Sequence, residues 1–158
     1  MKHKILVAFL FVSALCAVKS MAQKSSGTSY TNAVGMRVEF GSEYGTFAGI
    51  SGKHFFDTHN AGELHVVFGN NTTLIGAEYQ YHGDIENAAG LKWYAGFGPG
   101  VAFSDGTTDV LIRPIIGLDY KINQVPLSFG FDWRPAFVVT HGSDFNAARF
   151  GLGIRYAF

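Results

Sequence analysis

Apolar and polar residues alternate one by one along most of the chain after residue 32, as they do in a β-strand with one apolar face. The last such segment is the clearest. From Arg149 to Phe158 every even-numbered residue is large and apolar, and every odd-numbered one is Gly, Ala or Arg. No window shows a sustained helical period, so the pattern predicts an all-β protein.

Eight alternating segments follow one another, separated by turn-type residues. We predict strands at 33–41, 45–56, 61–69, 73–82, 90–103, 109–122, 125–139 and 147–158. Most of them reach the roughly 9–11 residues that a tilted strand needs to cross the hydrocarbon layer of a bilayer. An even number of strands is typical of single-chain bacterial barrels. The expected fold is therefore an eight-stranded, antiparallel, up-and-down transmembrane β-barrel.

The charged residues are sorted between the two faces of these strands. The apolar face carries no Lys, Arg, Asp or Glu, and seven acidic residues fall in or beside turns. The polar face carries eight basic and five acidic residues: Arg37, Glu39, Lys53, Glu63, Glu78, Lys92, Arg113, Asp119, Lys121, Asp132, Arg134, Arg149 and Arg155. Inside a narrow barrel these charges must pair or bind water, because an isolated buried charge is very costly. We therefore predict a charge network in the lumen.

Alternation by itself leaves open which face is inside, and a soluble barrel of the lipocalin type would turn the apolar face inward. The interior of an eight-stranded barrel is only just wide enough for side chains to fill, however, and this face holds too many aromatic and branched residues to fit. Glycines on the polar face would make room for long side chains. Aromatic residues near the predicted strand ends resemble interfacial girdles. These features favour the membrane barrel.

The N-terminus has the layout of a secretory signal peptide. A basic start is followed by an almost wholly apolar run at 5–17 and by the small-x-small site Ser20-Met21-Ala22. We predict a signal peptide at 1–22, cleaved after Ala22, a polar N-terminal lead-in at 23–32 and the barrel at 33–158. Cleavage would leave nine basic and twelve acidic residues and no cysteine, so we expect neither nucleic-acid binding nor a disulfide.

The final segment ends on an aromatic residue, and in this it resembles the terminal strand of bacterial outer-membrane barrels, which the barrel-assembly machinery reads. The resemblance implies that the assembly signal consists of Phe150, Leu152, Ile154, Tyr156 and Phe158. It also implies export through the periplasm into the outer membrane of a Gram-negative bacterium, with both termini in the periplasm. The expected partners are outer-membrane lipid or lipopolysaccharide and the assembly machinery, and the barrel is expected to be a monomer.

One candidate for catalysis lies in the last turn, where His141 and Ser143 form a His-x-Ser pair. It is similar to the catalytic pair of the outer-membrane lipid A 3-O-deacylases, in which serine is the nucleophile and histidine its base. In that family the pair is borne by a strand and a Glu follows, whereas here the pair is in a Gly-rich turn and the next strand offers Arg149. We therefore favour a turn, predict no catalytic residues, and keep the esterase as an alternative.

A metal site is conceivable at His65 and His82, which share the polar face with Glu63 and Glu78. Hydrogen bonding within a polar lumen explains the same residues, so we predict no metal site and no cofactor.

Three motifs carry a resemblance to a group of small outer-membrane barrel proteins common in Bacteroidetes, and more loosely to OmpX and the transmembrane barrel of OmpA. They are Gly90-Leu91-Lys92-Trp93-Tyr94-Ala95-Gly96-Phe97-Gly98, Ile116-Gly117-Leu118-Asp119-Tyr120 and Val125-Pro126-Leu127-Ser128-Phe129-Gly130-Phe131-Asp132-Trp133-Arg134-Pro135-Ala136-Phe137. The resemblance covers about residues 33–158 and implies a location and an architecture, but no activity. We expect a structural or interaction barrel with a salt-bridged, non-conducting lumen. A narrow channel that prefers anions is the other alternative, because eight basic residues outnumber five acidic ones.

Overall fold

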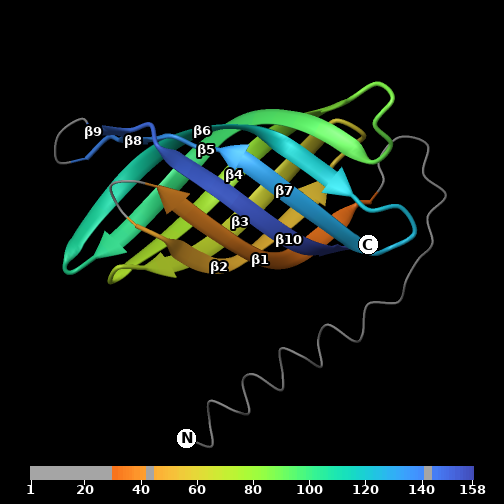
Figure 1. Ribbon diagram of the computed structural model, residues 1–158. Coiled ribbons are helices and arrows are strands. Elements are labelled where there is room, and N and C mark those ends of the chain that lie inside the picture. Colours follow the sequence, from red (N-terminus) through yellow and green to blue (C-terminus); the bar gives the residue numbers. More distant parts are fainter. Residues whose placement is uncertain (1–29, 42–44, 141–143) are drawn as a thin grey trace, which may run out of the picture.

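The computed structural model describes residues 30–41, 45–140 and 144–158, which form one closed β-barrel (Figure 1). The predicted signal peptide and most of the predicted lead-in lie outside the described residues. Within the described part of the chain, no helix is long and apolar enough to cross a membrane.

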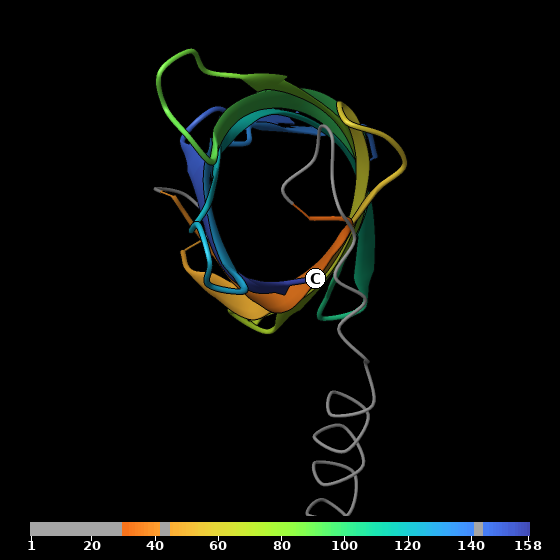
Figure 2. The same cartoon turned by 90° about the vertical axis from the view of Figure 1, so that its right-hand side faces the viewer.

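The strands follow one another in chain order, joined mainly by short turns. They are β1 (Asn32–Gly41), β2 (Phe47–Phe55), β3 (Asn60–Gly69), β4 (Thr72–Asp84), β5 (Leu91–Ser104), β6 (Thr107–Lys121), β7 (Leu127–Trp133), β8 (Ala136–Val138), β9 (Asp144–Asn146) and β10 (Arg149–Ala157). Each pairs antiparallel with its neighbours in the sheet. Seen along its axis, the sheet forms a ring (Figure 2).

The barrel closes between its first and last strands. Ala33 of β1 lies opposite Ala157 of β10, and the register continues to Gly41 opposite Arg149. β7 and β8 together form one strand of the barrel wall, and so do β9 and β10. We call each complete strand of the wall a stave, so the ten strands form eight staves. The predicted eight-stranded up-and-down barrel is thus confirmed.

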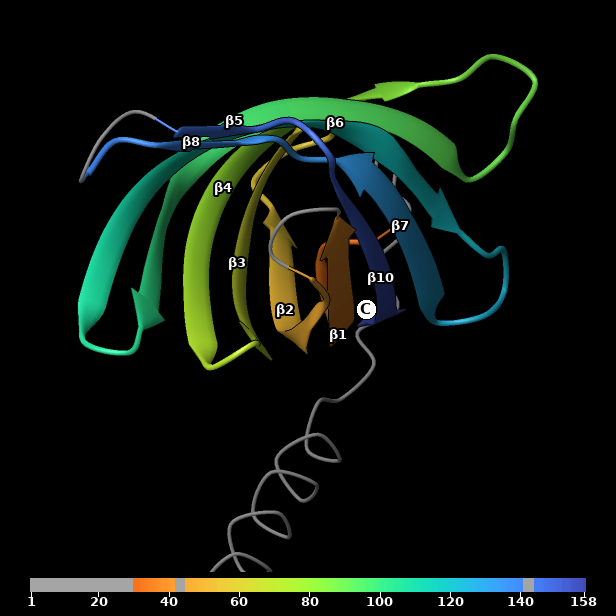
Figure 3. The same cartoon turned by 60° about the vertical axis from the view of Figure 1, so that its left-hand side comes forward.

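The last two staves differ from the unbroken strands predicted at 125–139 and 147–158. Arg134-Pro135 separates β7 from β8, and proline has no amide hydrogen to donate to the ladder. β9 occupies residues that the sequence assigned to a turn. Two exposed residues, Ala147 and Ala148, then separate inward-facing Asn146 from inward-facing Arg149, which shifts the alternation by one position. β8 continues alongside β6 past the end of β7 (Figure 3).

Two-residue turns connect β3 to β4 and β5 to β6. The φ angles are 48° and 56° at Asn70 and Asn71, and 34° and 85° at Asp105 and Gly106. A type I′ hairpin turn requires positive φ at both central positions, which Asn, Asp and Gly adopt most readily. The sequence predicted both turns at these residues. Both turns lie at the end of the barrel opposite residues 30 and 158. Because they are short, the chain stays close to the rim of the barrel there.

The barrel is polar inside and apolar outside. Outward-facing Met36 and Leu64 are 68% and 66% exposed, whereas inward-facing Arg37 is 1% exposed. A soluble barrel of the lipocalin type has the opposite arrangement, so that alternative is excluded. A continuous apolar outer wall of this kind is the surface that bilayer hydrocarbon covers.

Tyrosine and tryptophan side chains gather on the outer wall near the end where β1 begins and β10 ends. Tyr81 packs against Trp93 and His59, with ring centroids 5.9 and 5.6 Å apart. Tyr120 and Tyr156 lie at the same end of β6 and β10. Rings with one apolar and one polar edge are enriched at the boundary between lipid and water, so these residues mark one edge of the apolar wall.

Candidate functional site: the charged barrel interior

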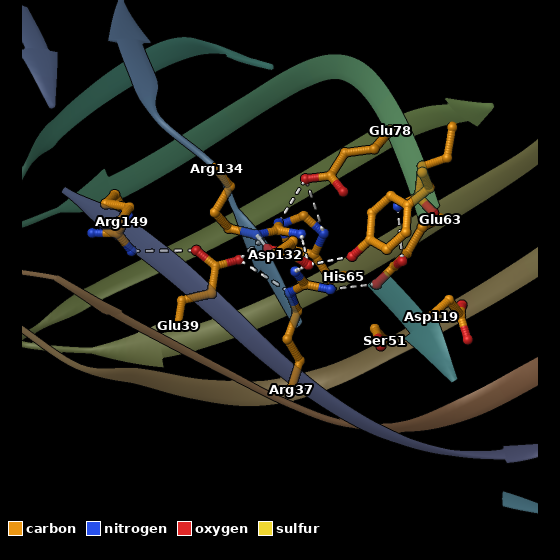
Figure 4. A network of polar contacts seen from close by, with 12 residues as sticks. Arg37, Glu39, Ser51, Glu63, His65, Glu78, Asp119, Asp132, Arg134 and Arg149 are labelled. Carbon is orange, nitrogen blue, oxygen red and sulfur yellow. Dashed lines mark hydrogen bonds and ion pairs between the residues drawn. The ribbon is translucent and has the colours of Figure 1, made fainter. Parts of the chain in front are cut away.

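Buried charged side chains from seven staves meet inside the barrel (Figure 4). We call them the interior ion network. Its members are Arg37, Lys53, Arg113, Arg134, Arg149 and Arg155 with Glu39, Glu63, Glu78, Asp119 and Asp132. They come together because inward and outward positions alternate along every strand, so that each stave contributes its polar residues to the same narrow space.

Glu39 contacts more arginines than any other described acid of the network. Its side chain is fully buried and its two carboxylate oxygens accept from four guanidinium groups: Arg113 at 2.5 Å, Arg134 at 3.2 Å, Arg149 at 3.2 Å and Arg37 at 3.3 Å. Three of these arginines belong to β1, β6 and β10, and Arg134 directly follows β7. One carboxylate therefore ties together staves that are far apart in the sequence.

Arg37 connects this carboxylate to acids of β3 and β7, each two staves away from β1. Its two terminal nitrogens donate to Glu63 at 2.6 Å and to Asp132 at 2.8 Å. Glu63 also accepts from Arg155 at 2.7 Å, and Asp132 from Arg134. Charge-assisted bonds of this length are about twice as strong as neutral ones. They make a continuous path of ion pairs across the lumen.

An aromatic layer covers the network toward the end where β1 begins. The Tyr30 hydroxyl donates to Asp119 at 2.7 Å, and Lys53 donates to the same carboxylate oxygen at 2.8 Å. The Tyr30 ring meets the edge of Phe55 at 5.1 Å, while the Lys53 ammonium lies 4.7 Å from the centre of the Tyr94 ring. Tyr30 was assigned to the polar lead-in, because no alternating pattern precedes β1 to indicate its direction.

An apolar layer covers the network at the opposite end. Its inward-facing side chains pack together and are buried: Phe47, Val67, Leu74, Leu111 and Ala136. The sequence did not single them out, because they interrupt an otherwise polar face. The interior ion network therefore lies between an aromatic layer toward one end and an apolar layer toward the other.

The structure buries twelve of the thirteen charged residues that the sequence assigned to the lumen. Lys121 is the exception and a correction. It is half-buried at the end of β6, where its ammonium reaches the carbonyl oxygens of Ile122 and Val125 at 2.9 and 2.6 Å. Lys92 is buried but pairs with the exposed Asp84, 2.7 Å away at the barrel mouth.

The charge excess is accordingly smaller than expected. Without Lys92 and Lys121, the interior ion network has six basic and five acidic members, an excess of one positive charge in place of the three from the sequence. Tyr94 and Gln80 complete it as neutral partners, donating to Asp132 at 2.6 Å and to Glu63 at 3.0 Å. Both occupy inward-facing positions in the strand alternation, so the sequence pattern could have identified them as interior residues.

The two histidines considered as metal ligands have separate partners. His65 contacts Arg113 at 2.9 Å, whereas His82 contacts Gln80 at 3.2 Å and stacks on Tyr94. No group of three or more candidate metal ligands occurs among residues 30–41, 45–140 and 144–158. The proposed catalytic pair His141 and Ser143 lies outside these residues.

Glycines of the inner face leave the space that the network occupies. A Cβ atom added to Gly151 would lie 2.5 Å from Asp132 Oδ1, 2.6 Å from Arg37 Nη2 and 2.9 Å from Arg134 Nε. At Gly52, on the outer wall, the nearest atom would be 3.9 Å away. The first position has no room for a methyl group, and the second has ample room.

Gly151→Ala should therefore destabilise the barrel by about 1–3 kcal/mol, the usual cost of overpacking a filled interior. Gly52→Ala is the matched control, and its effect should be neutral or stabilising by up to about 1 kcal/mol. Urea unfolding of both variants in lipid vesicles measures the difference. Equal stability of the two variants would contradict the close packing around Gly151.

No protein-family model matches the chain, and the comparison with curated proteins found no match. Among solved structures, the N-terminal β-barrel domain of Pseudomonas aeruginosa OprF is similar over 81% of this chain and 100% of that domain, with a TM-score of 0.59 and 14% identity. Neisserial surface protein A (NspA) matches over 85% of this chain and 100% of its own, with a TM-score of 0.48 and 14% identity. At this identity the likeness to the OprF domain concerns the fold. The resemblance to the Bacteroidetes group and to OmpX stays a prediction.

Proposed function

We propose that this chain is a structural or interaction β-barrel of the bacterial outer membrane, with a salt-bridged lumen that does not conduct. The observation that carries the proposal is the combination of an apolar outer wall with eleven buried, mutually paired charges inside it. The wall suits hydrocarbon, and the paired charges make a filled, rigid interior.

The closed lumen is supported by the order of its layers. Buried uncharged side chains narrow the lumen toward each end, Phe47 and Leu74 at one end and Tyr30 and Phe55 at the other. An ion crossing the middle would have to displace arginine–carboxylate pairs, and separating one buried pair leaves an uncompensated charge at a cost of about 3–5 kcal/mol. An excess of one charge also gives little basis for an anion-preferring channel.

The location is supported by two independent features. The outer wall is apolar and edged by tyrosine and tryptophan, and the fold is like that of the OprF domain. In this proposal the partners are outer-membrane lipid or lipopolysaccharide and, during insertion, the barrel-assembly machinery. No contact of the described residues favours the esterase alternative.

Planar-bilayer recording tests the proposal. The full-length protein, inserted from detergent, should give no conductance steps under conditions in which a general porin gives large ones. Unheated and boiled samples should migrate differently on an SDS gel, which shows that the inserted protein is a folded barrel. Regular steps with a chloride preference would overturn the closed lumen and favour the channel.

A further inference from the structure

A small cavity opens inside the barrel at the end opposite the Tyr30 layer. Its volume is about 140 Å³. Much of its wall is apolar, built by Phe47, Leu74, Leu111, Ala136 and Val138. An apolar cavity of about 150 Å³ accepts a molecule the size of benzene, so this one has room for a ring or a short branched chain of about six heavy atoms.

Asn146 of β9 lines the cavity and has no hydrogen-bond partner for its side chain. It is 2% exposed, and neither its amide nitrogen nor its carbonyl oxygen is bonded. Buried polar atoms are rarely left unpaired, because each unmet bond costs about 1–3 kcal/mol. The side chain therefore offers one donor and one acceptor to a molecule in the cavity.

The polar part of the wall has a cationic character. Arg113 and Arg149 both line the cavity, and Arg113 Nε is a second buried donor without a partner. Both guanidinium groups contact Glu39, which they share with two further arginines. The acid on the cavity wall itself, Asp109, accepts from the Thr140 hydroxyl at 2.9 Å. Unmet donors beside two arginines match the oxygens of an anion.

We propose that this cavity binds a small organic carboxylate. Its hydrocarbon part contacts Phe47 and Leu111, and its carboxylate accepts from the Asn146 amide and from the arginines. A water that enters with the ligand donates to the Asn146 carbonyl. The site forms because the Asn146 side chain of β9 points inward, whereas the alternation of β10 would turn position 146 outward. It does not depend on whether the lumen conducts.

Fluorine NMR with 2-fluoroisobutyrate, a branched carboxylate small enough for the cavity, tests the proposal on the full-length protein folded in detergent. The native barrel should bind the probe saturably. Asn146→Leu, which keeps the size but removes the polar atoms, should weaken binding at least tenfold, the effect of losing one or two hydrogen bonds. Ala136→Leu should abolish binding by filling the cavity. Phe145→Leu, at the exposed neighbouring position of β9, is the matched control and should bind like the native protein.

A second measurement uses only the native protein, so its result does not depend on whether the variants fold. The Asn146 side-chain amide resonances should shift as 2-fluoroisobutyrate is added, and 2-fluoroisobutyramide, which has a neutral amide in place of the carboxylate, should bind at least tenfold more weakly. The proposal is overturned if the native barrel shows no saturable binding, or if Ala136→Leu binds equally well, which means that the probe enters only the detergent. Equal binding of 2-fluoroisobutyramide also overturns it, because the polar wall then does not select the carboxylate.

Discussion

Replacing Glu39 with alanine should destabilise the barrel by about 3–5 kcal/mol, the largest effect expected of any single substitution in the lumen. The carboxylate is fully buried and contacts four arginines. Arg37 and Arg134 keep other carboxylate partners, but Arg113 is left with His65 and with Glu78 at 4.0 Å. Removing one anion therefore raises the excess of the interior ion network from one to two buried positive charges, with the Glu78 carboxylate as the remaining acid beside Arg113.

Urea unfolding in lipid vesicles, followed by the gel shift between folded and boiled forms, measures this loss. Glu39→Gln should cost less than Glu39→Ala, because the amide oxygen can still accept a hydrogen bond. Asp84→Ala is the control, since this acid is 71% exposed and its pair with Lys92 should be worth no more than about 1 kcal/mol. If Glu39→Ala cost no more than this control, the interior ion network would not be what holds the staves together.

Placing a charge on the middle of the outer wall should have the second largest effect. Ile154 is 54% exposed and lies opposite Met36, near the middle of β1. Ile154→Arg should cost about 2–4 kcal/mol in a bilayer, the value for a cation at the midplane of a β-barrel. In a soluble barrel the same surface substitution would be nearly neutral, so the result tests the lipid environment directly.

Thr108→Arg is the matched control for Ile154→Arg. Thr108 faces outward near the start of β6, opposite Phe103 at the end of β5, so an arginine there reaches the boundary with water. It should cost at most about 1 kcal/mol. Unfolding of both variants in the same vesicles gives the comparison. Equal and small losses at the two positions would show that hydrocarbon does not cover the wall.

Both predictions concern the same feature: the barrel has its polar side chains inside and its apolar side chains outside, the reverse of a soluble protein. In the function that we propose, lipid stabilises the outer wall and ion pairs stabilise the interior, so stability and function share their residues. At the Asn146 cavity the interior combines free volume with unpaired polar atoms.

The sequence by itself determined the number of staves, the two faces and two of the hairpin turns. This was possible because strand alternation has a period of two, so that each residue's direction follows from its neighbours. The charges at Arg37, Asp132 and Arg155 could be assigned to the interior in this way. The dipeptides Asn70-Asn71 and Asp105-Gly106 fixed the positions of two hairpin turns.

Alternation fails where the chain leaves the regular pattern. Tyr30 precedes β1, Lys121 lies at a strand end where its long side chain can reach backbone carbonyls, and one extra residue after Asn146 shifts the phase of the last stave. In each case a local bend or a strand end decides the direction of the side chain. Such features depend on contacts with other staves.

Only the tertiary structure decided which charges pair. Arg113 and Glu39 are 74 positions apart, and Arg149 and Glu39 are 110 apart. Alternation gives the face of a residue but not its height along the barrel axis, which depends on the register between all staves and on the closure of β1 against β10. The sequence therefore determined that the charges lie inside, and the closed barrel determined their partners.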